Sequence, residues 1–529
     1  MKTKLTYEDL ISRISILEAS LSAKDAAIAD RDAAIADRDA VIARKEERIA
    51  YLERLLFGSR SDKMARKAFE SNQPGLFDEL FNEAYDRKCA QIQRIAREIK
   101  KEAGKRRHQP RPKPVRPAKY KYYGLEERRR EVLPQGIEED LYDRIGQDET
   151  RILHREPAKL WVEVIVRPVF RLKSDKNSPC PQILQAPSRK PVIGGNHVGA
   201  DLLSRLVIDK YVYHIPEYRQ VRQYADLGVS LPTSTINGWI HAVAARLYPL
   251  YESLGEDIRS RQYLQVDEVP WRIADTPGKC RKGYAWQFFD ATPDSHGLYF
   301  YYHKGSRAGT IPRAQLKDYR GAIQTDGYRV YDYFEQQKDV TLLGCMAHVR
   351  RKFTDAQGSH PKLAAQATEY IQLLYELEAN LKARGATAEE TAAERQSRAL
   401  PIMDTMESWM KAAAGSCTPS DLMGKALDYA YKLWPRLRRY ADNGIYRIDN
   451  NPVERCQRPS VMGRKNYLFS KNDRGAEDNA VFYSLLESCQ ILGVNQLQWL
   501  THVLQQLAGN PAEEQLKQLL PYNYKKAQA

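Results

Sequence analysis

The stretch that decides the fold is YLQVDEVPWRI, from Tyr263 to Ile273. It begins with apolar and aromatic residues that favour strands, and it leads to two adjacent acids, Asp267 and Glu268. We therefore predict a buried strand that ends at these carboxylates. Because neighbouring residues of a strand point to opposite faces, only one of the two acids can face a common site.

Further strand and helix patterns follow this first strand in a fixed order. In chain order they are GYAWQFFDA (283–291), GLYFYYHKG (297–305), the helix-like RAQLKDY (313–319), GAIQTDGYRVYDYF (321–334) and VTLLGCMAHVRRKF (340–353). The fourth pattern is predicted to end a short strand at Asp326, and the fifth to be a buried strand that leads into a basic helix. Three antiparallel strands, a helix, a strand, a helix and another strand are the order of an RNase H-like fold, a mixed sheet with helices on both faces.

A third acid, Glu454, lies in the stretch DNNPVERCQRPSVMGRKNYLF, from Asp449 to Phe469. Two interpretations are open. With Asn451 as the N-cap and Pro452 as the first helical residue, Glu454 could be the partner in a capping box. Alternatively, it could join the two strand-end acids around Mg²⁺, because clustered carboxylates repel one another unless a cation lies between them. The cations that follow Glu454 favour the second interpretation, since they would meet phosphate.

Composition favours a polyanionic partner. The chain has 529 residues, with 83 Lys and Arg against 68 Asp and Glu, a formal net charge of +15. Such a balance is typical of nucleic-acid binding. The 7 cysteines are scattered without a CxxC pair, which fits a reducing cytoplasm. Neither a secretory signal nor a membrane span is predicted.

The N-terminal half predicts several smaller units. Isoleucine or leucine recurs at every seventh position from Ile14 to Leu56, which indicates a coiled-coil helix in residues 1–57, although a single solvated helix is the alternative. Residues 58–109 predict a basic helical DNA-binding region, and residues 110–185 a proline-rich basic linker with a small β module. Residues 186–254 predict helices with a turn at Gly228 and a second helix from near Thr233. This pattern suits a helix-turn-helix or an ordinary helical hairpin.

These motifs together resemble transposases of the insertion sequence 66 family. The matching stretches include LERLLFGSRSDK, VDEVPW, RKGYAW, IQTDGYRVYD, CMAHVRRKF, the run from Asp449 to Phe469, FYSLLESCQILGVNQLQWLTHVL and LLPYNY. The resemblance implies an α+β multidomain protein with an RNase H-like core (255–358 and 446–485). It also implies an Asp-Asp-Glu triad of Asp267, Asp326 and Glu454 that binds Mg²⁺, with Mn²⁺ as a substitute. Helical periodicity over 359–445 predicts a helical insertion, and residues 486–529 a C-terminal helical element.

The sequence departs from the family pattern at two places. The family usually carries a cysteine-rich zinc segment before the core, but residues 110–185 hold only Cys180, so we expect a degenerate zinc-ribbon-like region without structural zinc. The family usually has Asp-Glu-Thr-Pro at the first acid, where this chain has Val269 as the third residue. Cys345 and His348 form a C-x-x-H pair, which is interpreted as a buried structural pair or, alternatively, as placing His348 near the scissile phosphate.

The function implied is DNA transposition: cleavage at transposon ends, followed by strand transfer into target DNA. The alternatives are a catalytically impaired DNA-binding coiled-coil protein derived from a transposase, and a nonspecific RNase H-type nuclease. The expected partners are transposon-end and target DNA, a homodimer or higher oligomer, and accessory proteins of the same element. The expected place is the nucleoid in the bacterial cytoplasm. The predicted DNA contacts are Arg60, Lys63, Lys105, Arg106, Arg107, Arg350, Arg351, Arg455, Arg458, Arg464 and Lys465.

Overall fold

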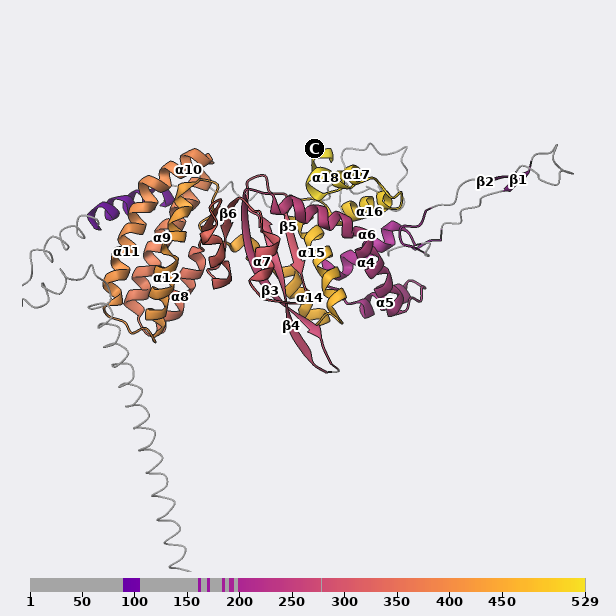
Figure 1. Ribbon diagram of the computed structural model, residues 1–529, viewed down its shortest axis with the longest axis horizontal. Helices are drawn as coiled ribbons and strands as arrows, with labels where there is room; N and C mark the ends of the chain where they lie inside the picture. The colour runs from indigo at the N-terminus through magenta and orange to yellow at the C-terminus, as the bar shows by residue number, and fades with distance from the viewer. Residues whose placement is uncertain are drawn as a thin grey trace, which may run out of the picture.

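The computed structural model describes residues 89–104, 160–162, 169–171, 183–185, 190–194, 198–276 and 278–528. The predicted coiled coil over 1–57 and most of the region at 110–185 therefore lie outside the described residues. A sheet-centred unit and a unit built from helices make up most of what is described (Figure 1). Among the described residues, no helix combines the length and hydrophobicity needed to cross a membrane.

The central sheet is mixed, as predicted. Its strands are β3 (Tyr263–Ala274), β4 (Cys280–Asp290), β5 (Leu298–Tyr302), β6 (Gly321–Gln324) and β7 (Val340–Leu343). They lie in the order β5-β4-β3-β6-β7. The first three form an antiparallel meander, and β6 and β7 run parallel to β3. Asp267 lies on the central strand, and the loop that carries Asp326 follows the neighbouring strand β6.

The predicted end of the first strand is wrong. β3 passes through Asp267 and Glu268 and continues to Ala274, with Asp267 opposite Gln287 of β4. The continuation is stabilised because Val269, Trp271 and Ile273 alternate along one face and are buried. The resulting β3–β4 hairpin projects beyond the rest of the sheet (Figure 1). β6, in contrast, ends at Gln324, before Asp326.

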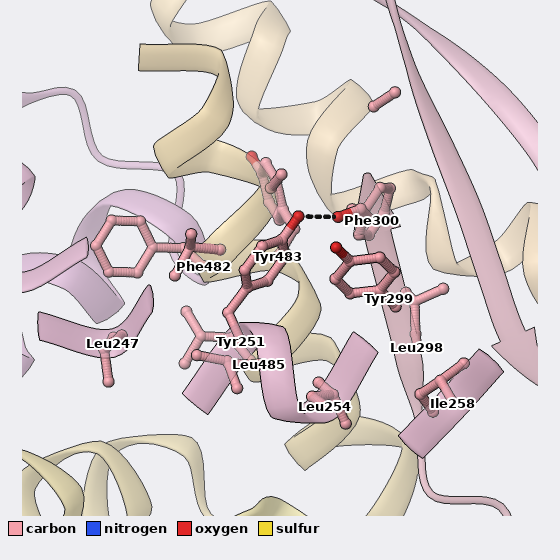
Figure 2. Close-up of a cluster of buried hydrophobic side chains, with 14 of the residues drawn as sticks. Leu247, Tyr251, Leu254, Ile258, Leu298, Tyr299, Phe300, Phe482, Tyr483 and Leu485 are labelled. Carbon is pink, nitrogen blue, oxygen red and sulfur yellow. Dashed lines mark hydrogen bonds between the residues drawn. The ribbon is translucent and has the colours of Figure 1, made fainter. Parts of the chain in front are cut away.

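Helices α6 (Thr233–Arg259) and α15 (Asp473–Leu492) cover the edge strand β5 (Figure 2). The backbone N–H groups of Leu298 and Phe300 donate to the hydroxyls of Ser488 and Ser484 at 2.9 and 2.8 Å. On the α6 side, the Tyr251 hydroxyl donates to the Phe300 carbonyl at 2.9 Å. These side chains take the place of a further strand, so the outward N–H groups of Leu298 and Phe300 are not left unpaired.

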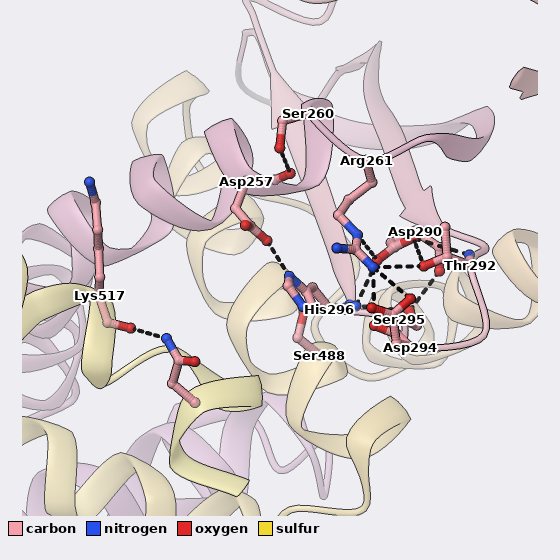
Figure 3. A network of polar contacts seen from close by, with 12 residues as sticks. Asp257, Ser260, Arg261, Asp290, Thr292, Asp294, Ser295, His296, Ser488 and Lys517 are labelled. Carbon is pink, nitrogen blue, oxygen red and sulfur yellow. Dashed lines mark hydrogen bonds and ion pairs between the residues drawn. The ribbon is translucent and has the colours of Figure 1, made fainter. Parts of the chain in front are cut away.

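The turn between β4 and β5 is held by a polar network (Figure 3). Arg261 pairs with Asp290 at 2.8 Å and with Asp294 at 2.8 Å. The His296 ring lies 2.7 Å from the Asp257 carboxylate and stacks on Tyr522 of the C-terminal helix α18 (Pro521–Gln528). The C-terminal element is thereby attached to the sheet. The predicted boundary at 485/486 falls inside α15, because that helix is continuous and buried through this point.

The predicted turn at Gly228 and helix start near Thr233 are confirmed. Helix α5 (Glu217–Asp226) ends before Gly228, whose φ of +84° favours glycine, and α6 begins at Thr233. α4 (Ala200–Tyr211) precedes them. Ile236, Ile240 and Val243 of α6 are buried in the hydrophobic core. Most of this face of α6 therefore packs inside the protein and is not available to another molecule.

Residues 346–442 form the helical unit, which contains most of the helical insertion predicted over 359–445. Its principal helices are α8 (Met346–Asp355), α9 (Pro361–Ala383), α11 (Leu400–Ala414) and α12 (Leu422–Arg438), which share one hydrophobic cluster. The short helix α10 (Ala388–Glu394) lies between α9 and α11 in the chain. Helical residues 89–104 pack into that cluster through Ile95 and Ile99. Glu102 also pairs with Arg398 of the insertion at 3.3 Å. A segment predicted to bind DNA is thus, in its described part, a piece of this bundle.

The remaining elements are short. β1 (Val169–Arg171) and β2 (Ile183–Gln185) form an antiparallel pair within the predicted β module, and residues 160–162 of the same region have no regular structure. The other elements are α7 (Thr310–Gln315), η4 (Arg329–Gln336), η5 (Ala356–Gly358), η6 (Arg395–Ala399), η7 (Arg439–Asp442), α13 (Asn451–Cys456), α14 (Arg458–Tyr467), α16 (Gln496–Leu507) and α17 (Glu513–Gln518).

Candidate active site

Asp267 is held in place from two sides. One carboxylate oxygen accepts a hydrogen bond from the side-chain amide of Gln457 at 2.6 Å. The other accepts the backbone N–H of Glu268 at 2.8 Å. Gln457 lies at the junction of α13 and α14, three residues after Glu454 and therefore on the same side of the helix. This contact joins the first acid to the helix that carries the third.

Asp326 lies in the loop after β6. Its carboxylate accepts the backbone N–H of Tyr328 at 2.8 Å, and the Tyr429 hydroxyl of α12 donates to its backbone carbonyl. Gly327 turns the chain with a φ of +87°, and a Cβ there would lie 2.5 Å from Leu433. The glycine therefore permits both the turn and the close approach of the helical unit.

Glu454 lies in α13, and the alternative interpretation, a capping box, is wrong. The helix begins at Asn451 with Asn450 as its N-cap, and the Asn450 side chain makes no cap hydrogen bond. Glu454 instead lies 3.4 Å from His348 and 3.7 Å from Arg351, both of α8. Its Oε1 atom, the one that faces His348, is buried and makes no hydrogen bond. This oxygen is therefore open to a closer donor or to a cation.

A buried network of glutamines positions the start of α13. The Gln265 amide donates to Gln324 of β6 at 2.8 Å and to the carbonyl of Asp449 at 2.9 Å. Gln324 in turn donates to the carbonyls of Gly344 and Arg447 at 2.9 and 2.8 Å. Because these bonds join β3, β6 and the segment before α13 without exposure to water, they fix the relative positions of the acid-bearing elements.

The three acids interact electrostatically. Burial raises the pKa of Asp267 well above its ordinary value, and the nearby carboxylates of Glu268, Asp326 and Glu454 raise it further. Carboxylates from separate elements thus disfavour the ionised form of Asp267, an effect that a cation would relieve. In the part of the chain that the structure describes, no group of three or more His, Cys, Asp or Glu side chains is arranged to hold a metal ion.

Glu268 faces the other side of β3, as the alternation of strand residues predicts. Its buried carboxylate accepts two hydrogen bonds from Arg307, at 2.6 and 3.0 Å, and one from the Tyr331 hydroxyl at 3.0 Å. Burial raises the pKa of Glu268, whereas Arg307 lowers it. Its bonds to Arg307 and Tyr331 give Glu268 a structural role.

The two residues of the C-x-x-H pair, Cys345 and His348, lie in different surroundings. Cys345 is fully buried, and its sulfur accepts the backbone N–H of Asn450 at 3.4 Å. His348 contacts Glu454, and burial lowers the pKa of its imidazole. The structural interpretation therefore fits Cys345, whereas His348 lies among the acids.

The predicted DNA contacts fall into three groups. Arg455, Arg458 and Lys465 are exposed on α13 and α14, whereas Arg464 donates to the carbonyl of Pro270 at 2.9 Å and so helps to hold α14 against β3. Arg350 and Arg351 line a cavity of about 350 Å³ beside Tyr375 and Asn451. The third group, Arg60, Lys63, Lys105, Arg106 and Arg107, lies outside the described residues.

Comparison with protein families decides the assignment. Residues 195–478 match the family described as Transposase IS66 family, and residues 484–522 match the IS66 C-terminal element. The chain belongs to the IS66 transposase family. This assignment confirms the resemblance seen in the sequence, and it supports a role in transposition with DNA as the partner.

Relatives of this IS66-family chain come from Sinorhizobium fredii (strain NBRC 101917 / NGR234). The uncharacterized protein y4jD is 30% identical over 400 residues, which are 72% of this chain and 76% of the relative. The uncharacterized protein y4qI is 29% identical over 396 residues, 72% of each chain. The uncharacterized protein y4hP is 26% identical over 411 residues, 73% of this chain and 72% of the relative.

Sequence reasoning missed two residues of this IS66-family site. Gln457 could have been found, because its spacing from Glu454 places both on one helix face. Tyr429 could not, because nothing in the sequence of the helical unit indicates that it reaches the backbone of Asp326.

Proposed function

We propose that this chain is a metal-dependent DNA transposase that cuts DNA at transposon ends and joins the freed end to target DNA. The observation that carries the proposal is the set of half-buried acids from separate elements whose charges oppose the ionisation of Asp267. Such a set is costly to build and is typical of sites that hold divalent cations.

The topology of the sheet supports an RNase H-like core. An antiparallel meander of β5, β4 and β3, followed by parallel β6 and β7, has the order that the sequence predicted for that fold. In such a sheet, one acid on the central strand and another after the neighbouring strand meet at one edge, and a helix from later in the chain brings the third acid.

The donor chemistry of these residues fits Mg²⁺ or Mn²⁺. All three side chains offer hard oxygen atoms, and Oε1 of Glu454 is buried without a hydrogen bond. Asp267, Asp326 and Glu454 would hold the ions. When bound, the ions would favour attack by an oxygen nucleophile and stabilise the leaving oxygen in phosphoryl transfer.

The protein's own residues would orient the acids and the DNA. Gln457 fixes the orientation of the Asp267 carboxylate, and Gly327 allows Asp326 to sit against α12. Arg350 and Arg351 would receive backbone phosphates in their cavity beside α13. We further propose that the chain acts at the bacterial nucleoid as a homodimer or higher oligomer paired through residues 1–57, with accessory proteins of the same element.

Cleavage and joining assays test this function. The wild-type chain is incubated with labelled duplex DNA carrying the terminal repeats of its element, and with random duplex, in Mg²⁺, Mn²⁺ or EDTA. Asp326→Asn removes one charge while keeping the shape of the side chain, and Asp332→Asn is the matched control on nearby η4.

The proposal expects metal-dependent nicking and strand transfer on terminal-repeat DNA, a loss of at least about 100-fold in Asp326→Asn, and little change in the control. Binding without nicking in any metal would favour the catalytically impaired alternative. Equal cleavage of random duplex would favour a nonspecific nuclease.

A further inference from the structure

Helices α13 and α14 run almost as one helix. The residue between them, Gln457, keeps helical angles (φ −73°, ψ −24°). The break in hydrogen bonding follows from Pro459, which lacks the N–H that would continue the ladder. The side chains of this segment therefore follow a single helical periodicity from Asn451 to Tyr467.

Two adjacent faces of this helix have different roles. On the inner face, Glu454, Gln457 and Arg464 contact the acid site and β3. A second row of residues, displaced by one position along each turn, forms an outer stripe. Its members are exposed and are spaced three or four residues apart. The outer stripe consists of Arg455, Arg458, Met462, Lys465 and Phe469. Its helical part, from Arg455 to Lys465, spans about 15 Å at 1.5 Å per residue and begins beside Glu454, and Phe469 follows in the turn after α14.

The end of the outer stripe is strained. Leu468 has a φ of +67°, which is unfavourable for a residue with a branched side chain, yet its side chain is 60% exposed and Phe469 is 46% exposed. Backbone bonds from Leu468 N–H to the Arg464 carbonyl and from Phe469 N–H to the Tyr467 carbonyl hold this turn. Because little packing in the described protein offsets the strain, the turn resembles those found at ligand-binding sites.

The positive surface continues onto the projecting hairpin. Ser470, next to Phe469, exchanges backbone hydrogen bonds with Arg272 and Ala274 of β3. Arg272 and Lys282 of the hairpin are exposed. Cations therefore flank the apolar end of the stripe on both sides.

We propose that the outer stripe binds an unpaired DNA strand next to the acid site, with phosphates on the cations and a base stacked on Phe469. Cations interleaved with apolar and aromatic side chains are typical of single-strand binding, because unpaired bases expose faces that a duplex keeps stacked. A duplex would use only the cations. The proposal rests on the proposed function for its biological meaning, since DNA must be opened or cut for such a strand to exist.

DNA-binding measurements under conditions that prevent catalysis test this proposal. Fluorescence anisotropy of the full chain is measured in EDTA with a labelled 20-nucleotide single strand and with the duplex of the same sequence, over a range of salt concentrations. The variants are Phe469→Ala, Phe469→Trp and Lys465→Gln. Tyr248→Ala is the control, because Tyr248 is an aromatic residue of α6 with a similar exposure of 51%.

Loss of one stacked base is expected to weaken single-strand binding by about tenfold or more in Phe469→Ala, with the duplex affinity within about twofold. Phe469→Trp should retain binding, and Lys465→Gln should reduce the salt slope for the single strand by about 0.7. The control should change neither.

The proposal would be overturned by unchanged single-strand binding in Phe469→Ala, or by an equal loss of affinity for both DNA forms. It would also be overturned by a change of oligomeric state in size-exclusion chromatography with light scattering, because that result would assign Phe469 to a contact between copies. Because no metal is present, these results are independent of cleavage. Asp326→Asn should abolish cleavage while leaving single-strand binding intact.

Discussion

The buried carboxyl of Glu487 offers a quantitative test of the core beneath the site. Glu487 lies in α15, is 6% exposed, and has a pKa that burial raises from 4.5 to about 8. Its charge also raises the pKa of the Cys456 thiol in α13, after the larger effect of burial, so it lies close to the helix that carries Glu454. Replacement of Glu487 by glutamine keeps the shape of the side chain and removes its ionisation.

The magnitude follows from the two pKa values. The difference is 8 − 4.5 = 3.5, so ionisation in the folded protein costs about 5 kcal/mol at about 1.4 kcal/mol per pH unit. Because the folded state holds the proton more tightly, its contribution to stability is complete below pH 4.5 and is lost as the pH rises through about 8. At pH 7 the wild-type protein has lost about 3 kcal/mol of this contribution.

Hydrogen exchange of α15 peptides, read by mass spectrometry and corrected for intrinsic rates, measures the local opening free energy. Between about pH 5 and pH 8, the opening free energy of α15 in the wild type should fall by about 3–4 kcal/mol more than the opening free energy in Glu487→Gln. Glu477→Gln, on the exposed side of the same helix, is the control and should stay within about 1 kcal/mol of the wild type. Parallel pH profiles for wild type and Glu487→Gln would refute the reasoning, because they would mean that the carboxyl has the same charge in both states.

Three further predictions concern stability. Arg307→Met should destabilise the protein by about 1–3 kcal/mol, because half-exposed Arg307 supplies the charged partner of buried Glu268, which then keeps only the Tyr331 hydroxyl. Chemical denaturation should show partial recovery when Glu268→Gln is added, and the absence of recovery would contradict the pairing. Ser484→Ala or Ser488→Ala should each cost about 1–3 kcal/mol by leaving a β5 N–H unsatisfied, which faster exchange of that strand would reveal. Asp267→Asn should raise the melting temperature without metal and abolish any stabilisation by Mg²⁺; an unchanged Mg²⁺ response would place the ion elsewhere.

Local pattern in the sequence determined much of the architecture. Alternating and apolar runs located the five strands, the glycine at position 228 located the turn before α6, and helical periodicity located the helices between β7 and α13. These features depend on neighbours within a few residues, which a sequence displays directly. The three acids were identified in the same way, by their places at the strands and at the helix start, with the family resemblance added.

Long-range contacts decided the rest. The extension of β3 to Ala274 depends on pairing with β4, and the replacement of a capping role for Glu454 by contacts with α8 depends on where the helical unit packs. The bond from Gln457 to Asp267 joins residues that are 190 positions apart, and the docking of residues 89–104 on the insertion joins segments even more distant. Periodicity reveals which face of an element is apolar but not which partner covers it, since many partners would bury the same surface with similar free energy. Only the tertiary structure chose among them.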